Sequence, residues 1–182
     1  MGDGGRQTGR AVLETRTPDR QTRGRTENRA GSLFRCGNRW RKPVRRHRVK
    51  DPRLAENPQE LWNGDSVEVY LDTLNSRETV YNFQHRRLVC GPSGSRTYII
   101  GEKWGIKFAT QKTDDGYTVE MSAHNYGLGV RLHGRALGFD VAVNDSDDGQ
   151  TRACRLVWRG TNHNDTDPSG FGTIVLPTEE KR

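Results

Sequence analysis

The stretch Leu61-Trp62-Asn63-Gly64-Asp65-Ser66-Val67-Glu68-Val69-Tyr70-Leu71-Asp72 predicts a turn followed by a β-strand. Its second half alternates strictly between apolar and polar residues, and successive side chains of a strand point to opposite faces. We therefore expect a half-buried strand whose polar face carries Glu68, Tyr70 and Asp72. Carboxylates and a phenol close to Trp62 suit the binding of sugar hydroxyls or of a hard cation. A solvated strand face with one structural tryptophan is the simpler alternative.

Further short strands are predicted at regular spacing along the chain. Asp115 and Gly116 form an Asp-Gly turn, which joins the alternating segments 104–111 and 117–123 into a hairpin. No segment shows a convincing helical period. This pattern predicts an all-β fold, an antiparallel β-sandwich of jelly-roll or immunoglobulin-like type. The remaining strands are expected at 80–85, 97–100, 136–144, 151–158 and 171–176.

The front of the chain differs in composition from the rest. Residues 1–50 hold 15 of the 30 Lys and Arg residues but 4 of the 23 Asp and Glu residues, a net charge of +11, whereas the remainder has a net charge of −4. We expect residues 1–48 to be an Arg-rich tail that is either disordered or the product of a wrong reading frame or start site. The β-sandwich is expected at 49–177, followed by a short tail at 178–182. In the frame-artefact case the sandwich lacks its first strands.

Several classes of protein are disfavoured by the motifs that the chain does not have. Its three cysteines, Cys36, Cys90 and Cys154, form no C-x-x-C pair, which argues against a structural zinc site and a dense disulfide framework. A Cys90–Cys154 bridge remains open. The chain contains no H-E-x-x-H or G-x-S-x-G motif, which disfavours a zinc enzyme and a serine hydrolase. No apolar run has the length of a membrane span, and no signal peptide is visible.

A series of sequence blocks occurs in the order in which one known family has them. Between about Val49 and Leu176 the chain resembles family 9 carbohydrate-binding modules. The blocks that carry this resemblance are the stretch 61–72, the segment 115–120, the segment 137–145 with its G-F-x-x-x-V-N-D pattern, residues 152–158, and the D-P-S-x-F-G pattern at 167–172.

This resemblance implies a β-sandwich module of the kind attached to secreted polysaccharide-degrading enzymes such as xylanases. It implies a non-catalytic role, in which the module binds a xylan- or cellulose-type polysaccharide for a parent glycoside hydrolase in a secreted or periplasmic bacterial protein. Such modules hold a sugar ring between two tryptophans, because the apolar C–H faces of a pyranose pack on aromatic rings. Trp62 matches the first tryptophan, and Glu68 matches a carboxylate that binds sugar hydroxyls.

The chain departs from the family pattern at three positions. The second tryptophan of the family would fall at Asp165-Thr166, its sugar-binding arginine on the second strand at Asn82, and a further tryptophan at Asn125. We therefore expect the family fold with altered sugar contacts. The carbohydrate-binding residues expected from the sequence are Trp62, Glu68, Tyr70, Asn82 and Trp104.

The family resemblance also implies structural calcium, which takes six to eight oxygen ligands. Oxygen-bearing side chains are concentrated at the end of the segment 136–144 and in the turn that follows it. Asp140, Asn144 and Asp145 are the expected ligands, and Asp72 is a further candidate. A solvated acidic turn is the alternative.

Other functions stay open beside carbohydrate binding. A glycosidase would need a pair of carboxylates, for which Glu68 and Glu120 are the candidates. A haem-binding electron-transfer domain of the same sandwich architecture would need axial ligands, for which Met121 and His124 are available. A basic nucleic-acid-binding arm at 1–48, on an inert sandwich, is the last alternative. Carbohydrate binding by a non-catalytic module is preferred because no acid–base constellation stands out.

Overall fold

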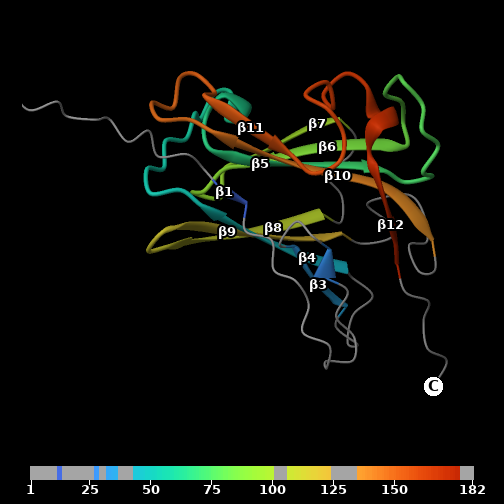
Figure 1. The fold of residues 1–182 in the computed structure, drawn as a ribbon, viewed down its shortest axis with the longest axis horizontal. Coiled ribbons are helices and arrows are strands. Elements are labelled where there is room, and N and C mark those ends of the chain that lie inside the picture. Colours follow the sequence, from blue (N-terminus) through green and yellow to red (C-terminus); the bar gives the residue numbers. More distant parts are fainter. Residues whose placement is uncertain are drawn as a thin grey trace, which may run out of the picture.

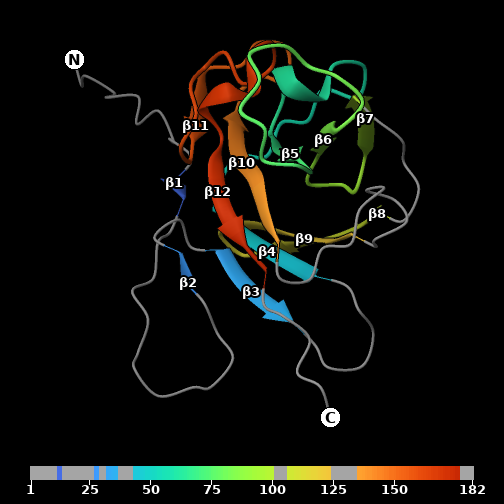
Figure 2. The same cartoon turned by 90° about the vertical axis from the view of Figure 1, so that its right-hand side faces the viewer.

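The computed structural model describes residues 12–13, 27–28, 32–36, 43–100, 106–123 and 135–176. In these ranges the chain forms two antiparallel sheets that face each other as two layers (Figures 1 and 2). The described part contains no α-helix, only the 3-10 turns η1 (Leu61–Asn63) and η2 (Pro168–Gly170), and no helix there could span a membrane. The predicted antiparallel all-β sandwich is therefore confirmed.

The first sheet, the lower layer in Figure 1, contains the described strands of the N-terminal segment. Its strand order is β2-β3-β4-β9-β8, with β1 beside β4. Strand β4 pairs with β9 from Val44–Ser122 to Lys50–Gly116, so it extends across residue 49, where the sequence predicts the domain to start. The strands are β1 (Val12–Leu13), β2 (Glu27–Asn28), β3 (Ser32–Cys36), β4 (Pro43–Lys50), β8 (Ile106–Thr113) and β9 (Gly116–Ala123).

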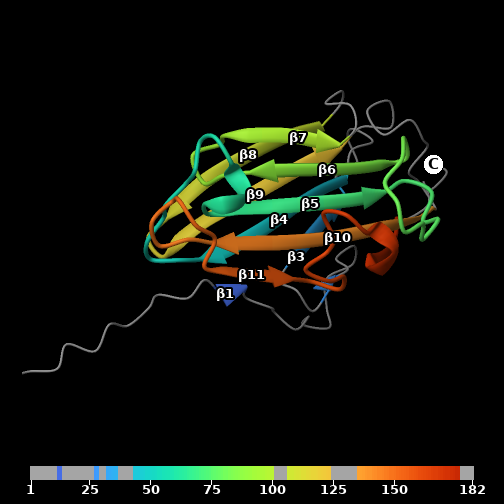
Figure 3. The same cartoon turned by 90° about the horizontal axis from the view of Figure 1, so that it is seen from above.

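The second sheet has the strand order β11-β10-β5-β6-β7 (Figure 3), and β12 also lies beside β10 (Figure 2). Strand β10 pairs with β5 along one edge, and with β11 and then β12 along the other. The loop 158–171 runs from β11 to β12, so both of its ends lie beside the same strand, β10. The strands are β5 (Ser66–Asp72), β6 (His85–Cys90), β7 (Arg96–Ile100), β10 (Ala136–Asp145), β11 (Cys154–Val157) and β12 (Gly172–Val175).

The two sheets bury a shared apolar core. Val67, Val69 and Leu71 of β5 point into it, as the alternation predicts. Trp158 packs against the core, with its ring centroid 5.9 Å from that of Phe139. The thiols of Cys90 and Cys154 are both free. The other core residues are Val49, Leu88, Cys90, Ile106, Tyr117, Val119, Met121, Leu137, Phe139, Val141, Val143, Ile174 and Leu176.

The predicted β8–β9 hairpin is present, and its glycine is needed for two reasons. Gly116 has a φ of 152°, in the region that side chains rarely adopt. A Cβ at this position would lie 2.0 Å from the carbonyl oxygen of Val49 on β4. The turn therefore fixes how closely β9 approaches β4.

The second sheet differs from the prediction in the position of one strand. A strand is predicted at 80–85, but β6 occupies His85–Cys90 and residues 73–84 form the loop before it. In this loop Phe83 is 85% exposed and Val80 is 70% exposed, so their apolar character does not mark a buried strand face. The shift takes Asn82 off the strand and places Arg87 on it.

Strand β5 is buried on both faces, whereas the sequence predicts a half-buried strand. All seven of its residues are buried. The face that carries Glu68 and Tyr70 is covered by side chains of neighbouring strands and of the loop 158–171, where Phe171 packs on Tyr70 with ring centroids 5.5 Å apart. A polar face that is covered in this way has to satisfy its charges internally or with a ligand.

Candidate functional site

Glu68 is at the centre of the polar face and is 0% exposed. Its Oε2 accepts hydrogen bonds from Arg87 Nε at 3.0 Å, from Arg87 Nη2 at 2.9 Å and from the Tyr70 hydroxyl at 2.6 Å. Its Oε1 accepts a hydrogen bond from Asn144 Nδ2 at 2.9 Å and lies 3.4 Å from Arg155 Nη2. The carboxylate is therefore held in one orientation by side chains of β5, β6, β10 and β11.

These partners also determine the charge of Glu68. Burial by itself would raise the pKa of this carboxyl, but the guanidinium groups of Arg87 and Arg155, with the hydrogen bonds from Tyr70 and Asn144, bring its pKa below the ordinary value. Glu68 is thus a carboxylate at neutral pH. Burial and the charge of Glu68 raise the pKa of Tyr70, so its phenol remains protonated and donates to Glu68.

Arg87 connects the buried carboxylate to the half-buried Trp62 ring. Its guanidinium carbon lies 6.0 Å from the centre of the Trp62 ring and 5.9 Å from that of the Tyr70 ring. A guanidinium group packed against an aromatic ring can still donate hydrogen bonds from its edge. The site therefore places an aromatic face beside fixed hydrogen-bond donors.

The loop 158–171 borders this face and is held to the rest of the domain by hydrogen bonds. The carboxylate of Asp140 on β10 accepts hydrogen bonds from two successive backbone N–H groups of the loop and, at 2.9 Å, from the side-chain amide of Asn164. Arg155 donates to the Asn162 carbonyl at 2.8 Å, and the Tyr81 hydroxyl donates to the Asn164 carbonyl. The loop is therefore held to the sheet from several directions.

The structure brings together three of the five expected sugar contacts, namely Trp62, Glu68 and Tyr70. Asn82 lies in the loop 73–84, where its backbone N–H donates to His85 Nδ1 at 3.1 Å and its side chain bonds to Glu78. Trp104 lies outside the described residues.

Three arginines of the site were not anticipated from the sequence. Arg87 lies directly opposite Tyr70 across the β5–β6 pair, and Arg155 lies opposite Asn144 across the β10–β11 pair. Arg152 donates to Asn144 Oδ1 at 3.3 Å. One clue in the sequence could have indicated these arginines: when a strand that carries a carboxylate becomes buried, that carboxylate needs basic partners on nearby strands.

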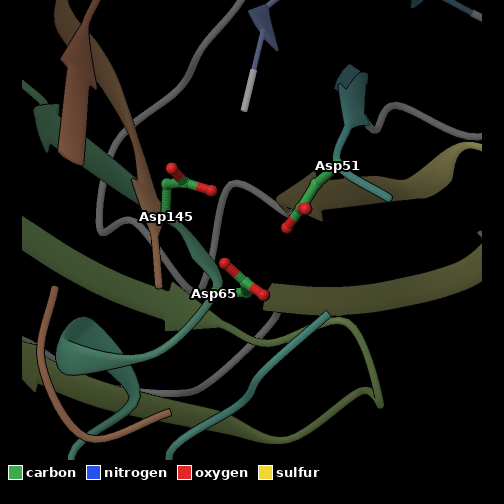
Figure 4. Close-up of side chains that lie close together, drawn as sticks. All are labelled: Asp51, Asp65 and Asp145. Atoms are coloured by element: carbon green, nitrogen blue, oxygen red, sulfur yellow. The ribbon is translucent and has the colours of Figure 1, made fainter. Parts of the chain in front are cut away.

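A second cluster, of three carboxylates, lies where three strands begin or end (Figure 4). Asp51 follows β4, Asp65 precedes β5 and Asp145 ends β10. One oxygen of each lies within 4.8 Å of the others, and all three residues are buried. Asp51 adjoins a strand of the first sheet, whereas Asp65 and Asp145 lie at the ends of strands of the second, so the cluster bridges the two layers.

The polar atoms of this cluster are not all satisfied by the protein. Within the part of the chain that the structure describes, Asp51 Oδ2 and the Tyr117 hydroxyl are buried without a hydrogen-bond partner. Burial raises the pKa of Asp65 to about 7, and burial with the charges of Asp65 and Asp51 raises the pKa of Tyr117. Buried carboxylates that lie this close together repel one another, so they need a bound cation or a shared proton to offset their charge. An all-oxygen donor set fits calcium.

Of the four calcium ligands expected from the sequence, only Asp145 lies in this cluster. Asp140 binds the loop 158–171 instead, and Asn144 donates to Glu68. Asp72 accepts hydrogen bonds from the backbone N–H of Leu74 at 3.1 Å within the β5–β6 loop. The expected set is therefore distributed over different parts of the second sheet.

Two alternative functions do not agree with this geometry. Glu120 lies between the inward-pointing Val119 and Met121 of β9, so it faces outward on the first sheet, whereas Glu68 faces outward on the second. Packed sheets are about 10 Å apart, so these two carboxylates are too distant for a glycosidase pair. Met121 is 4% exposed inside the core, which does not suit a haem ligand, and His124 lies outside the described residues.

These features define a two-layer β-sandwich binding domain with an aromatic, arginine-lined site on one outer face. Residues 45–179 match the family described as "Carbohydrate family 9 binding domain-like". The chain therefore belongs to this family of carbohydrate-binding domains, and the resemblance drawn from the sequence is confirmed.

Relatives of the chain carry names of polysaccharide-degrading enzymes. It is 30% identical over 138 residues to "Exoglucanase XynX" of Acetivibrio thermocellus, a match that covers 70% of this chain and 12% of that protein. It is 28% identical over 130 residues to "Endo-1,4-beta-xylanase A" of Thermotoga maritima, with the same coverage of 70% and 12%. The chain thus spans only a small part of the curated relatives that it matches.

Solved structures share the fold. One is a family 9 carbohydrate binding module from Caldicellulosiruptor kristjanssonii in complex with cellotriose, with a TM-score of 0.72, 23% identity, and coverage of 82% of this chain and 75% of that chain. Another, from the same organism in complex with glucose, has a TM-score of 0.70, 24% identity, and coverage of 78% and 73%. The sandwich is therefore the fold of family 9 modules.

Proposed function

We propose that the outer face of the second sheet binds a polysaccharide, and that the domain does so without catalysis, as the accessory part of a secreted glycoside hydrolase. The observation that carries this proposal is the position of Arg87, which contacts the Trp62 ring on one side and the Glu68 carboxylate on the other. An aromatic face beside fixed donors matches the chemistry of a sugar, which has apolar C–H faces and equatorial hydroxyls.

In this proposal the residues have different roles. Trp62 supplies the stacking surface, and Arg87, whose side chain is 13% exposed, donates hydrogen bonds to sugar oxygens. Glu68 is fully buried, so it acts as a positioning residue that holds Arg87 in place. Asp165, at the position of the family's second tryptophan, has a 40% exposed side chain and offers an acceptor in place of a second ring. The sugar therefore stacks on one aromatic face.

A structural calcium ion completes the proposal. Asp51, Asp65 and Asp145 would hold it, with the unpartnered Asp51 Oδ2 as one ligand atom. The ion would neutralise buried carboxylates and fix the ends of β4, β5 and β10 relative to one another. Its role would be structural, because the cluster is formed by different residues from those of the arginine-lined site.

The proposal is tested by calorimetric titration of the full chain with xylo- and cello-oligosaccharides. Wild type should bind, and Trp62→Ala should weaken binding by about 10- to 100-fold, because an aromatic–sugar stack contributes about 1–3 kcal/mol by the usual burial of apolar area. Phe83→Ala removes an aromatic ring that is 85% exposed in the β5–β6 loop and serves as the matched control. Absence of binding by folded wild type, or equal affinities for wild type and Trp62→Ala, would contradict the proposal.

A further inference from the structure

The charges around the proposed sugar site are unbalanced. Three guanidinium groups surround the single buried carboxylate of Glu68: Arg87 Nη2 lies 2.9 Å, Arg155 Nη2 3.4 Å and Arg152 Nη1 3.9 Å from its oxygens. A further carboxylate, Asp165, lies 3.9 Å from Arg155 Nη1. The cluster thus holds one more positive than negative charge even when Asp165 is counted.

Of the two carboxylates, Asp165 compensates the positive charge of the arginines less effectively. The Asp165 side chain is 40% exposed, so its long contact with Arg155 is screened by solvent. Arg155 itself is only 6% exposed, and its Nε is buried without a hydrogen-bond partner among the described residues. A buried donor without an acceptor is costly, so the contact with Glu68 does not fully satisfy the Arg155 guanidinium.

The remaining groups of the face do not remove this imbalance. Tyr70 is a neutral phenol that donates to Glu68 and accepts from Arg155. Asn144 is an amide that donates to Glu68 and accepts from Arg152 at 3.3 Å. The positive excess is therefore a property of the whole face, and it reaches the surface through Arg152, whose side chain is 33% exposed.

We propose that this site prefers an acidic sugar, a uronic acid residue of a polysaccharide, over a neutral one. This inference rests on the proposed carbohydrate binding and specifies its ligand. A uronate ring has the apolar C–H faces that stack on Trp62, and its carboxylate is planar with two acceptor oxygens, the geometry that a guanidinium group binds in bidentate fashion. Arg87 and Arg152 are the partly exposed guanidinium groups that would receive it.

The test compares matched sugars on the full chain by calorimetric titration. Glucose and glucuronic acid differ only in the oxidation of C6, and xylo-oligosaccharides are compared with the same oligosaccharides that carry a glucuronic acid branch. The acidic member of each pair should bind at least about tenfold more tightly, since its carboxylate adds a charge–charge attraction to the guanidinium groups that a neutral sugar lacks. This preference should shrink as the salt concentration rises.

Variants connect the preference to the named residues. Arg152→Gln should lower the ratio of acidic to neutral affinity several-fold. Arg159→Gln removes an exposed arginine that packs on Trp158 and should leave the ratio unchanged. Equal affinities for the acidic and neutral members, or an unchanged ratio in Arg152→Gln, would overturn the inference while carbohydrate binding stands. Failure of every sugar to bind would overturn the proposed function as well.

A final arm separates sugar recognition from simple anion binding. Sodium acetate and sodium sulfate are added as competitors at the ionic strength of the titration. Weak competition by both salts supports a site for acidic sugars. Displacement by either salt at the concentration at which glucuronic acid itself binds would mean that the site recognises anions without a sugar ring, and the inference would be wrong.

Discussion

Arg87 donates two hydrogen bonds to the same carboxylate oxygen of Glu68, from Nε at 3.0 Å and from Nη2 at 2.9 Å. This pair joins β6 to β5 in the middle of the second sheet. Because Glu68 has no exposed surface, its charge is compensated only by the groups packed on it. We therefore expect stability and the proposed sugar binding to depend on the same pair of residues.

Glu68→Gln should destabilise the fold and weaken sugar binding together. The substitution leaves Arg87 and Arg155 without their shared counter-charge, and breaking a buried ion pair in this way costs about 3–5 kcal/mol. Urea unfolding followed by tryptophan fluorescence measures the change. Glu78→Gln, at an exposed position of the β5–β6 loop, should shift stability by no more than about 0.5 kcal/mol. Similar unfolding midpoints for the two variants would contradict this role of Glu68.

The lowered pKa of Glu68 predicts how stability changes with pH. A carboxyl whose pKa is lower in the folded than in the unfolded state stabilises the fold at pH values above its unfolded pKa of about 4.3. That contribution is lost as the pH falls through the lower, folded value. The melting temperature of wild type should therefore decline below about pH 4.3 more steeply than that of Glu68→Gln. Parallel declines of the two proteins would show that other carboxyls dominate the acid response.

Calcium should stabilise the protein through Asp51, Asp65 and Asp145. At 100 times its dissociation constant a ligand adds about 2.7 kcal/mol, which corresponds to a rise in melting temperature of about 5–10 °C for a chain of this size. The rise should disappear with a chelator and in Asp65→Asn, but persist in Asp147→Asn, where the acid is exposed and paired with Arg53. A calcium-induced shift of equal size in Asp65→Asn would refute this assignment.

Alternation in the sequence predicted which residues share a face, but not what covers that face. The inward positions of β5 are correct because the apolar set Val67, Val69 and Leu71 can face only the core. The burial of Glu68 depends on Arg87, Asn144 and Arg155, which lie on strands distant in sequence and carry no pattern that points to β5. The facing of side chains within a strand is thus local information, whereas the covering of a polar face depends on tertiary structure.

The same limit explains the misplaced strand β6 and why the carboxylate cluster was not recognised in the sequence. Segment 80–85 reads as a strand because Tyr81 and Phe83 alternate with polar residues, yet Tyr81 packs on His85 and Phe83 is exposed. The true strand, H-R-R-L-V-C, begins with three basic residues, of which Arg87 is tolerated because it pairs with Glu68 and Arg86 because it donates to backbone carbonyls. The cluster was missed because its members come from three segments that only the folded sandwich brings together.

Gly116→Ala should be one of the most disruptive single substitutions in the chain. Its φ of 152° disfavours any side chain, at a cost of about 1–3 kcal/mol for such backbone strain, and the Cβ would also collide with the Val49 carbonyl oxygen. Thermal unfolding monitored by circular dichroism measures the loss. Gly170→Ala is the control, since a Cβ there would meet its nearest neighbour at an ordinary 3.5 Å. Comparable melting temperatures of the two variants would argue against a close β4–β9 contact.

Residues 43–48 should be required for a stable sandwich. They form most of β4, which pairs with β9, and their removal would leave β9 as an unpaired edge next to β8. A variant that starts at residue 43 should remain monomeric in size-exclusion chromatography, whereas one that starts at residue 49 should unfold at a lower temperature and aggregate. Equal stability and solubility of both variants would show that β9 does not need this neighbour.

The loop 158–171 is attached to β10 at both ends, through β11 and β12, and in its middle through Asp140. The sugar site proposed on this face would therefore be preorganised, so that little conformational entropy is lost when a ligand arrives. Association should then proceed in one step, without a slow rearrangement that limits its rate. Ligands of different affinity should accordingly differ in how long they stay bound, while their association rates remain similar.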